Sequence, residues 1–167
     1  MRQTLQNKNV SFIHLHTHSH YSFLSGIPSP AELAQAAAAN GMDALALTDQ
    51  HGLTGAVEFY DACQFAGVRP ILGLELPVAA PSDGLRSGVD ALVLLALDMA
   101  GWASLCRLSS ALQTNPEGDP ARGLPFEHFA DHTTGLICLT GGVRGLLTHF
   151  VSAGQESAAA HYLRRLR

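Results

Sequence analysis

Short apolar segments alternate with helix-type stripes along the whole of this 167-residue chain, and this alternation limits the possible folds most strongly. The apolar segments are far shorter than the roughly 20 residues that span a bilayer, and β-branched residues are common in them. Strand and helix alternate at least five times, which favours a parallel α/β architecture. The predicted strands are Val10–Leu15, Ala44–Thr48, Ile71–Leu74, Ala91–Leu97 and Gly135–Leu139.

The first predicted helix has well-marked ends. Ser29 is suited to the N-cap, Pro30 to the first helical position, and Glu32 completes a capping box. Asn40 and Gly41 end this helix, because such residues accept the left-handed backbone of a C-terminal cap. A second helix is predicted over Leu53–Ala66, with an apolar stripe of Leu53, Ala56, Val57, Tyr60 and Cys63. Three later helical segments are also predicted. The first has a face of Trp102, Leu105, Cys106, Ser109 and Leu112, and the other two are Leu146–Val151 and Gln155–Leu166.

Composition and charge limit the environment and the partners. The chain is 47% hydrophobic, which is enough for a buried core, and its start is polar where a signal peptide would be apolar. We therefore expect a cytoplasmic protein that does not contact membranes. The net charge of −4 argues that this chain is not a strong nucleic-acid binder by itself, since such binding needs clustered cations.

Four histidines occupy alternate positions directly after the first predicted strand. His14, His16, His18 and His20 would share one face of an extended segment, because side chains two residues apart point to the same side. Functional groups of parallel α/β folds gather at the carboxyl ends of the strands, where the second predicted strand reaches Asp49 and the third reaches Glu75. We expect these groups to meet at one rim.

Imidazole and carboxylate groups in this combination fit a Zn²⁺ or Mn²⁺ site made by His16, His18, Asp49 and Glu75. Such an ion would polarise a phosphoryl oxygen, so phosphoester hydrolysis is the reaction expected, with Asp49 and Glu75 as the catalytic candidates. The alternatives are a solvated histidine-rich stretch and the remnant of an expression tag. The sequence has no Walker loop, GxSxG or GxGxxG motif placed to support another chemistry.

Several segments resemble the PHP (polymerase and histidinol phosphatase) domain of bacterial DNA polymerase III alpha subunits. The likeness runs from about Phe12 to Val151 and is strongest in three motifs. They are residues 14–26 (His-Leu-His-Thr-His-Ser-His-Tyr-Ser-Phe-Leu-Ser-Gly), residues 45–60 (Leu-Ala-Leu-Thr-Asp-Gln-His-Gly-Leu-Thr-Gly-Ala-Val-Glu-Phe-Tyr) and residues 70–75 (Pro-Ile-Leu-Gly-Leu-Glu); residues 92–108 and 135–142 are similar to further polymerase segments.

The resemblance implies a distorted (β/α)7-type PHP barrel, incomplete in this chain, so that residues 1–167 form the N-terminal part of one PHP domain. It implies that His16, His18 and Glu75 are metal ligands and that Asp49 is a ligand or supports one. It also implies Zn or Mn, or a mixture, in this site and Mg in the parent polymerase. The parent, a DNA-directed DNA polymerase, would bind DNA, nucleotides and other replisome subunits.

Four positions depart from the family pattern, namely Ser25, Gln50, Ala91 and Gly142, which stand where polymerases often have aspartate, histidine, histidine and cysteine. His51 is a further ligand candidate, because it lies one place beyond the expected histidine. The resemblance thus leaves two functions open: a metal-dependent phosphoesterase acting as a 3′–5′ exonuclease or pyrophosphatase, or a structural domain whose metal is weakly held or lost. The four departures favour the structural function. A third candidate is a stand-alone phosphoesterase of the histidinol-phosphatase type.

Overall fold

The computed structural model describes residues 12–81, 88–114 and 121–167, which form a mixed α/β fold. A four-stranded sheet and six α-helices make up this described part, together with one short 3-10 helix. The strands are β1 (Ala44–Leu47), β2 (Arg69–Ala79), β3 (Val89–Ala96) and β4 (Leu136–Leu139). The helices are α1 (Pro30–Ala39), α2 (Ala56–Ala66), α3 (Met99–Thr114), α4 (Phe126–Ala130), α5 (Leu146–Ser152) and α6 (Glu156–Arg165), with the 3-10 helix η1 at Gly142–Arg144.

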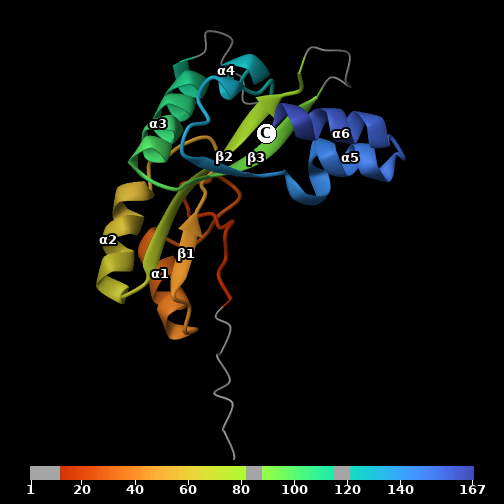
Figure 1. Cartoon of the computed structure of the whole chain (residues 1–167). Coiled ribbons are helices and arrows are strands. Elements are labelled where there is room, and N and C mark those ends of the chain that lie inside the picture. The colour runs from red at the N-terminus through yellow and green to blue at the C-terminus, as the bar shows by residue number, and fades with distance from the viewer. Residues whose placement is uncertain (1–11, 82–87, 115–120) are drawn as a thin grey trace, which may run out of the picture.

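The long strand β2 joins two parts of the sheet, whose order is β1-β2-β3-β4. Its first half pairs in parallel with β1, from Ala44 beside Arg69 to Leu47 beside Leu72. Its second half pairs with β3 in antiparallel register, from Gly73 beside Leu95 to Ala79 beside Val89. Figure 1 shows the result: α1, β1 and α2 lie around the lower part of β2, whereas β3 and the other helices surround its upper part.

The prediction of an all-parallel sheet is wrong for β3 and β4, because both pair antiparallel with their neighbours. A parallel connection needs a crossover of about a dozen residues or more, usually containing a helix. Residues 80–88 between β2 and β3 are too few for such a crossover. The chain therefore turns back on itself and pairs as a hairpin.

The predicted first strand, Val10–Leu15, is also not borne out in its described part, since residues 12–15 have no strand conformation. This segment still runs beside β1, where the Ala46 amide donates a hydrogen bond to the His14 carbonyl. The seven-stranded barrel, of which these four strands would be a part, stays a prediction.

The helix signals in the sequence have different outcomes. The capping box of α1 is confirmed, with the Ser29 hydroxyl accepting from the Glu32 amide and the Glu32 carboxylate accepting from the Ser29 amide. Helix α2 begins at Ala56, later than predicted, and it buries Phe59 completely. Two members of the predicted stripe, Val57 and Tyr60, are 69% and 47% exposed, so this stripe was partly wrong.

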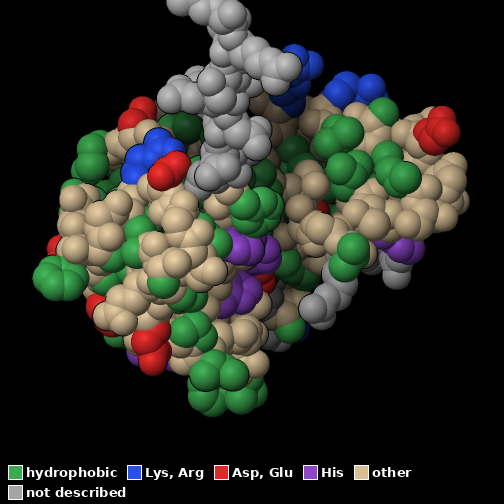
Figure 2. All heavy atoms as spheres, turned by 90° about the horizontal axis from the view of Figure 1, so that it is seen from below, with side chains coloured by type: hydrophobic (Ala, Val, Ile, Leu, Met, Phe, Trp, Pro, Cys, Tyr) green, Lys and Arg blue, Asp and Glu red, His purple; other side chains and the backbone are tan. Residues whose placement is uncertain are grey.

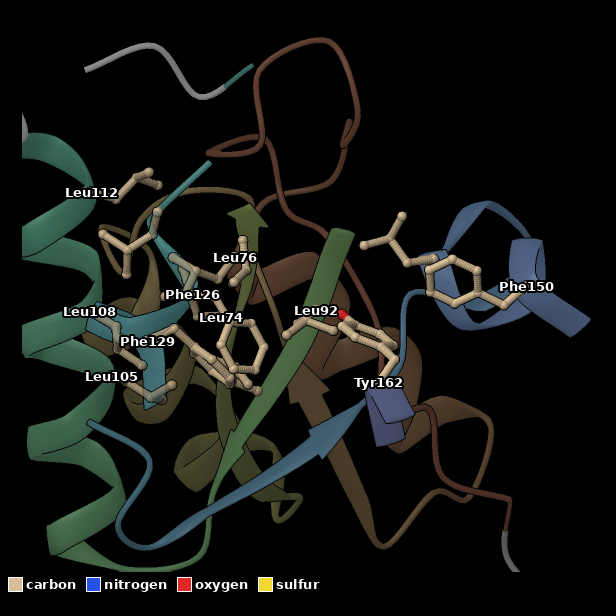
Figure 3. Packing of buried hydrophobic residues seen from close by; sticks show 14 of the residues in the cluster. Leu74, Leu76, Leu92, Leu105, Leu108, Leu112, Phe126, Phe129, Phe150 and Tyr162 are labelled. Atoms are coloured by element: carbon tan, nitrogen blue, oxygen red, sulfur yellow. The ribbon is translucent and has the colours of Figure 1, made fainter. Parts of the chain in front are cut away.

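Three hydrophobic clusters form in the described part of the chain, and the two larger ones cover the two halves of the sheet. Helices α1 and α2 cover β1 with residues that include Ala34, Phe59 and Cys63. On the other half, the leucines of α3 and the phenylalanines of α4 pack against β2 and β3, as Figure 3 shows. Full burial of one such leucine or phenylalanine contributes about 1.5–3 kcal/mol. The larger cluster consists of Leu74, Leu76, Val78, Leu92, Leu94, Leu105, Leu108, Leu112, Leu124, Phe126, Phe129, Leu146, Phe150, Ala159 and Tyr162.

A buried carboxylate holds the C-terminal helices against β3. Asp90 is inaccessible to solvent and accepts a hydrogen bond of 2.7 Å from the Tyr162 hydroxyl of α6 and one of 3.2 Å from the Leu146 amide of α5. Burial and the neighbouring Asp90 carboxylate raise the pKa of the Tyr162 phenol. In the part of the chain that the structure describes, no helix is both long and apolar enough to cross a membrane.

Candidate metal centre

His16, His18 and Glu75 converge although 57 or more positions separate the glutamate from the histidines in the sequence. The Nε2 atom of His16 lies 2.7 Å from Glu75 Oε2 and 3.0 Å from His18 Nε2. The third side of this triangle, from His18 Nε2 to Glu75 Oε2, is 3.3 Å. Figure 2 shows histidine side chains gathered around an acidic group in a hollow of the face seen from below.

These spacings, which are also those of hydrogen bonds, would allow the three atoms to share one metal ion. Nitrogen and oxygen ligands lie about 2.0–2.1 Å from Zn²⁺, so neighbouring ligand atoms are separated by about 3.0 Å in octahedral and about 3.4 Å in tetrahedral geometry. The three measured separations, from 2.7 to 3.3 Å, lie close to this interval. Two histidines and one carboxylate on a single side of an ion leave its other positions open, which is typical of catalytic sites.

Backbone pairing on both edges of β1 brings the three candidate ligands together. On one edge, the Thr48 amide donates to the Thr17 carbonyl at 2.9 Å and thereby places the residues on either side of Thr17 at the end of β1. On the other edge, the Glu75 amide donates to the Asp49 carbonyl at 3.1 Å. The sequence predicted that Glu75 lies at the end of its strand. This prediction was wrong, because β2 continues to Ala79.

The structure places Asp49 behind the histidines instead of among them. Its side chain is 3% exposed and accepts three hydrogen bonds, from the Ser19 amide (2.7 Å), the Ser19 hydroxyl (2.7 Å) and the Ser22 hydroxyl (2.6 Å). These bonds fix the turn that follows His18. Sequence reasoning missed both serines, and their only signal was that two hydroxyl groups stand close to the histidine motif.

His51 also lies outside the group of three ligands among the described residues. Its backbone has a left-handed φ of 65°, its amide donates to the Glu75 carbonyl, and its carbonyl accepts from the Gln113 side chain at 2.9 Å. The main chain of His51 therefore connects Glu75 of β2 to the Gln113 side chain of α3.

Gln50 lies beside the candidate ligands. In the sequence, Gln50 was noted only as a departure from the family pattern, where polymerases often have histidine. Its side-chain Nε2 donates a hydrogen bond of 2.8 Å to Glu75 Oε1, the carboxylate oxygen that faces away from the histidines. The Ser25 hydroxyl in turn donates to Gln50 Oε1 at 2.9 Å. A connected row of side chains thus runs from Ser25 through Gln50 to Glu75.

The surroundings of Glu75 keep its carboxylate charged. Burial raises the pKa of this group, but hydrogen bonds from His18, Gln50 and His16 outweigh burial and lower the pKa to about 2. Glu75 is therefore ionised at neutral pH, the state in which a carboxylate can bind a metal ion.

A cavity of about 820 Å³ opens in front of the ligands. One side is polar and the other, formed by β3, β4 and the glycine turn after β4, is mainly apolar. No Lys or Arg belongs to its lining among the described residues, so a bound phosphate would meet no fixed cationic side chain. The lining residues are His16, His18, Ser25, Gln50, Glu75, Val89, Ala91, Val93, Leu139, Thr140, Gly141, Gly142 and Val143.

Comparisons with known proteins show the family to which the chain is related. A family model described as the PHP domain matches residues 14–167. The chain is 36% identical to DNA polymerase III subunit alpha of Bacillus subtilis over 90% of its own length, and 37% identical to an error-prone DNA polymerase of Symbiobacterium thermophilum over 92%. It spans only 13% and 15% of the lengths of these two relatives. The chain is thus homologous to the PHP region of these polymerases.

Solved structures give weaker likenesses. A protein assigned as a metal-dependent phosphoesterase from Bifidobacterium adolescentis aligns with 74% of this chain and 50% of its own, with a TM-score of 0.46 and 19% identity. An amidohydrolase from Chromobacterium violaceum aligns with 72% of this chain and 49% of its own, with a TM-score of 0.43 and 26% identity.

Proposed function

We propose, since the chain belongs to the PHP domain family, that it holds one transition-metal ion between His16, His18 and Glu75 and hydrolyses a phosphoester there. The observation that carries this proposal is the triangle of ligand atoms, with sides from 2.7 to 3.3 Å, beside an open cavity. Zn²⁺ or Mn²⁺ fits this ligand set. When bound, such an ion supplies Lewis-acid polarisation of a phosphoryl oxygen and lowers the pKa of water.

The protein's own groups have separate tasks in this proposal. His16 and His18 offer their Nε2 atoms, and Glu75 offers Oε2 as the anionic ligand. Asp49 enters as the anchor of the turn after His18, because its three hydrogen bonds from Ser19 and Ser22 occupy the carboxylate. The cavity lining carries no lysine or arginine among the described residues, so the ion itself would balance the phosphate charge.

The test combines metal content with turnover. The chain is stripped with a chelator, reloaded with Zn²⁺ or Mn²⁺, and measured for bound metal by mass spectrometry and for hydrolysis of bis(p-nitrophenyl) phosphate. We expect one ion per chain, and losses of metal affinity of about 10- to 100-fold or more in His16→Ala, His18→Ala and Glu75→Gln. His128→Ala, which removes an exposed histidine of α4, is the matched control. A wild-type chain that binds no ion, or equal binding in His16→Ala and His128→Ala, refutes the proposal.

A structural domain is the second candidate, and the cavity lining favours it. All four positions that depart from the family pattern, Ser25, Gln50, Ala91 and Gly142, line the cavity and offer no metal ligand of the usual kind. One ion bound without any turnover of phosphodiesters, phosphomonoesters or pyrophosphate would support this candidate over the enzyme.

We further propose that the chain acts as the PHP part of a longer DNA-directed DNA polymerase. Its support is the identity of 36–37% to polymerase relatives of which the chain spans a small share. The binding of DNA, nucleotides, Mg²⁺ and other replisome subunits belongs to this proposal for the parent. A genomic reading frame without a polymerase region would refute it and leave the stand-alone phosphoesterase.

A further inference from the structure

The geometry points to Gln50 as the residue that positions Glu75, leaving one carboxylate oxygen for the metal ion and withholding the other from a second ion. This inference rests on the proposed metal site. It goes beyond that site by giving a task to a side chain that is not itself a ligand.

The orientation of the Gln50 amide follows from its two neighbours. The amide nitrogen faces Glu75 Oε1 and donates a hydrogen bond to it at 2.8 Å. The amide oxygen then faces Ser25, whose hydroxyl donates to it at 2.9 Å. Both ends of the amide are thus satisfied in one orientation only.

The main chain holds Gln50 where this contact is made. The Gln50 amide donates to the Ser22 hydroxyl at 3.0 Å, and Ser22 is itself bonded to the buried Asp49. Gln50, in the segment that follows β1, also pairs with Glu75 in the middle of β2 through an isolated parallel β-bridge. A side chain fixed at both its backbone and its tip costs little further entropy to hold in place.

The consequence for Glu75 is a division of its two oxygens. Oε2 lies 2.7 Å from His16 Nε2 and belongs to the ligand triangle, whereas Oε1 is bound to Gln50. A carboxylate can bridge two cations when both of its oxygens are free. With Oε1 engaged by a donor, Glu75 binds through Oε2 alone, and the site is confined to one ion.

Two substitutions at position 50 should therefore act in opposite directions. Gln50→Ala removes the donor, releases the Glu75 carboxylate and weakens Co²⁺ or Zn²⁺ binding by about 10- to 100-fold, as loss of a group that orients a ligand typically does. Gln50→Glu has the same shape but places a second carboxylate beside Oε1. Because two adjacent carboxylates repel each other, we expect it to recruit a second cation.

The experiment measures Co²⁺ affinity and the number of ions bound, using the visible absorption of cobalt and equilibrium dialysis. Ser25→Ala, which removes only the group that orients the amide, should show a smaller loss of affinity with an unchanged count of one ion. Gln64→Ala and Gln64→Glu on the exposed side of α2 are matched controls and should bind one ion as the wild type does. Circular dichroism melts without metal establish that each variant is folded.

The outcomes distinguish a failure of this inference from a failure of the proposed metal site. If the wild type binds no ion, the metal site and the role of Gln50 both fall. If the wild type binds one ion and a folded Gln50→Ala chain binds it equally well with the same cobalt spectrum, only the role of Gln50 falls. A Gln50→Glu chain that still binds a single ion would refute the division of the two Glu75 oxygens.

Discussion

Asp49→Asn should destabilise the metal-free chain, because Asp49 anchors the turn after His18. The wild-type carboxylate accepts from the Ser19 amide, the Ser19 hydroxyl and the Ser22 hydroxyl, at 2.6–2.7 Å. An asparagine can place its oxygen where Oδ1 lies and keep two of these bonds as neutral ones. Its NH₂ group then faces the Ser19 hydroxyl, which already accepts from the Tyr21 amide.

The magnitude follows from these bonds. One hydrogen bond to a charged group contributes about 1.5–3 kcal/mol, and a neutral one about 1 kcal/mol. Loss of one bond and weakening of two are partly offset, because a neutral amide is easier to bury than a carboxylate. We therefore expect the free energy of unfolding to fall by about 2–3 kcal/mol, which corresponds to a drop in Tm of about 4–12 °C for a domain of this size.

Urea unfolding and thermal melting, both in the presence of a chelator, measure this effect. Asp61→Asn, which changes an exposed aspartate of α2, is the matched control and should change the free energy of unfolding by no more than about 0.5 kcal/mol. A double-mutant cycle with Ser22→Ala should give a coupling of about 0.5–3 kcal/mol between the two side chains. If the metal-free Asp49→Asn chain has the same Tm as the metal-free wild type but no longer binds the ion, Asp49 is a ligand and the reasoning fails.

Two further predictions concern ionisation and the second buried carboxylate. The folded-state pKa of Glu75, about 2, lies below its ordinary value of 4.5, so its ionised form stabilises the chain above about pH 4.5 and this contribution is lost as the pH falls towards 2. Between these pH values the metal-free wild type should lose more free energy of unfolding than Glu75→Gln; equal losses in urea titrations would contradict the lowered pKa. Tyr162→Phe removes the hydrogen bond of 2.7 Å to the buried Asp90 and should lower the free energy of unfolding by about 2 kcal/mol. The control, Tyr60→Phe on an exposed part of α2, should lower it by almost nothing. Equal stability of these two variants in urea would show that the buried bond contributes little.

The sequence predicted best where neighbouring residues decide the structure. The capping box of α1 involves Ser29 and Glu32, three residues apart, and the left-handed backbone of Gly41 after α1 is set by the glycine itself. Both were confirmed. The sequence also predicted that His16, His18, Asp49 and Glu75 would meet at the ends of strands. His16, His18 and Glu75 do lie together, whereas the Asp49 carboxylate is bonded to Ser19 and Ser22.

Predictions failed where distant contacts decide the outcome. Helix α2 is apolar on more than one side, so its periodicity could not distinguish the buried Phe59 from the exposed Val57 and Tyr60. The antiparallel direction of β3 depends on a connection too short for a crossover, which the alternation of apolar segments did not reveal. The surroundings of Asp49 depend on hydroxyl groups of Ser19 and Ser22, whose donors face it only once the chain has folded.

The long strand β2 pairs with β1 along its first half and with β3 along its second half, so it belongs to both parts of the sheet. At Glu75 both edges of β2 are paired, because Glu75 lies opposite Val93 of β3 and also bridges Gln50 in the segment that follows β1. Both candidate histidines flank Thr17, whose carbonyl accepts a hydrogen bond from the Thr48 amide. A cation held by all three side chains would therefore connect the segment before β1 to the middle of β2, across the end of β1.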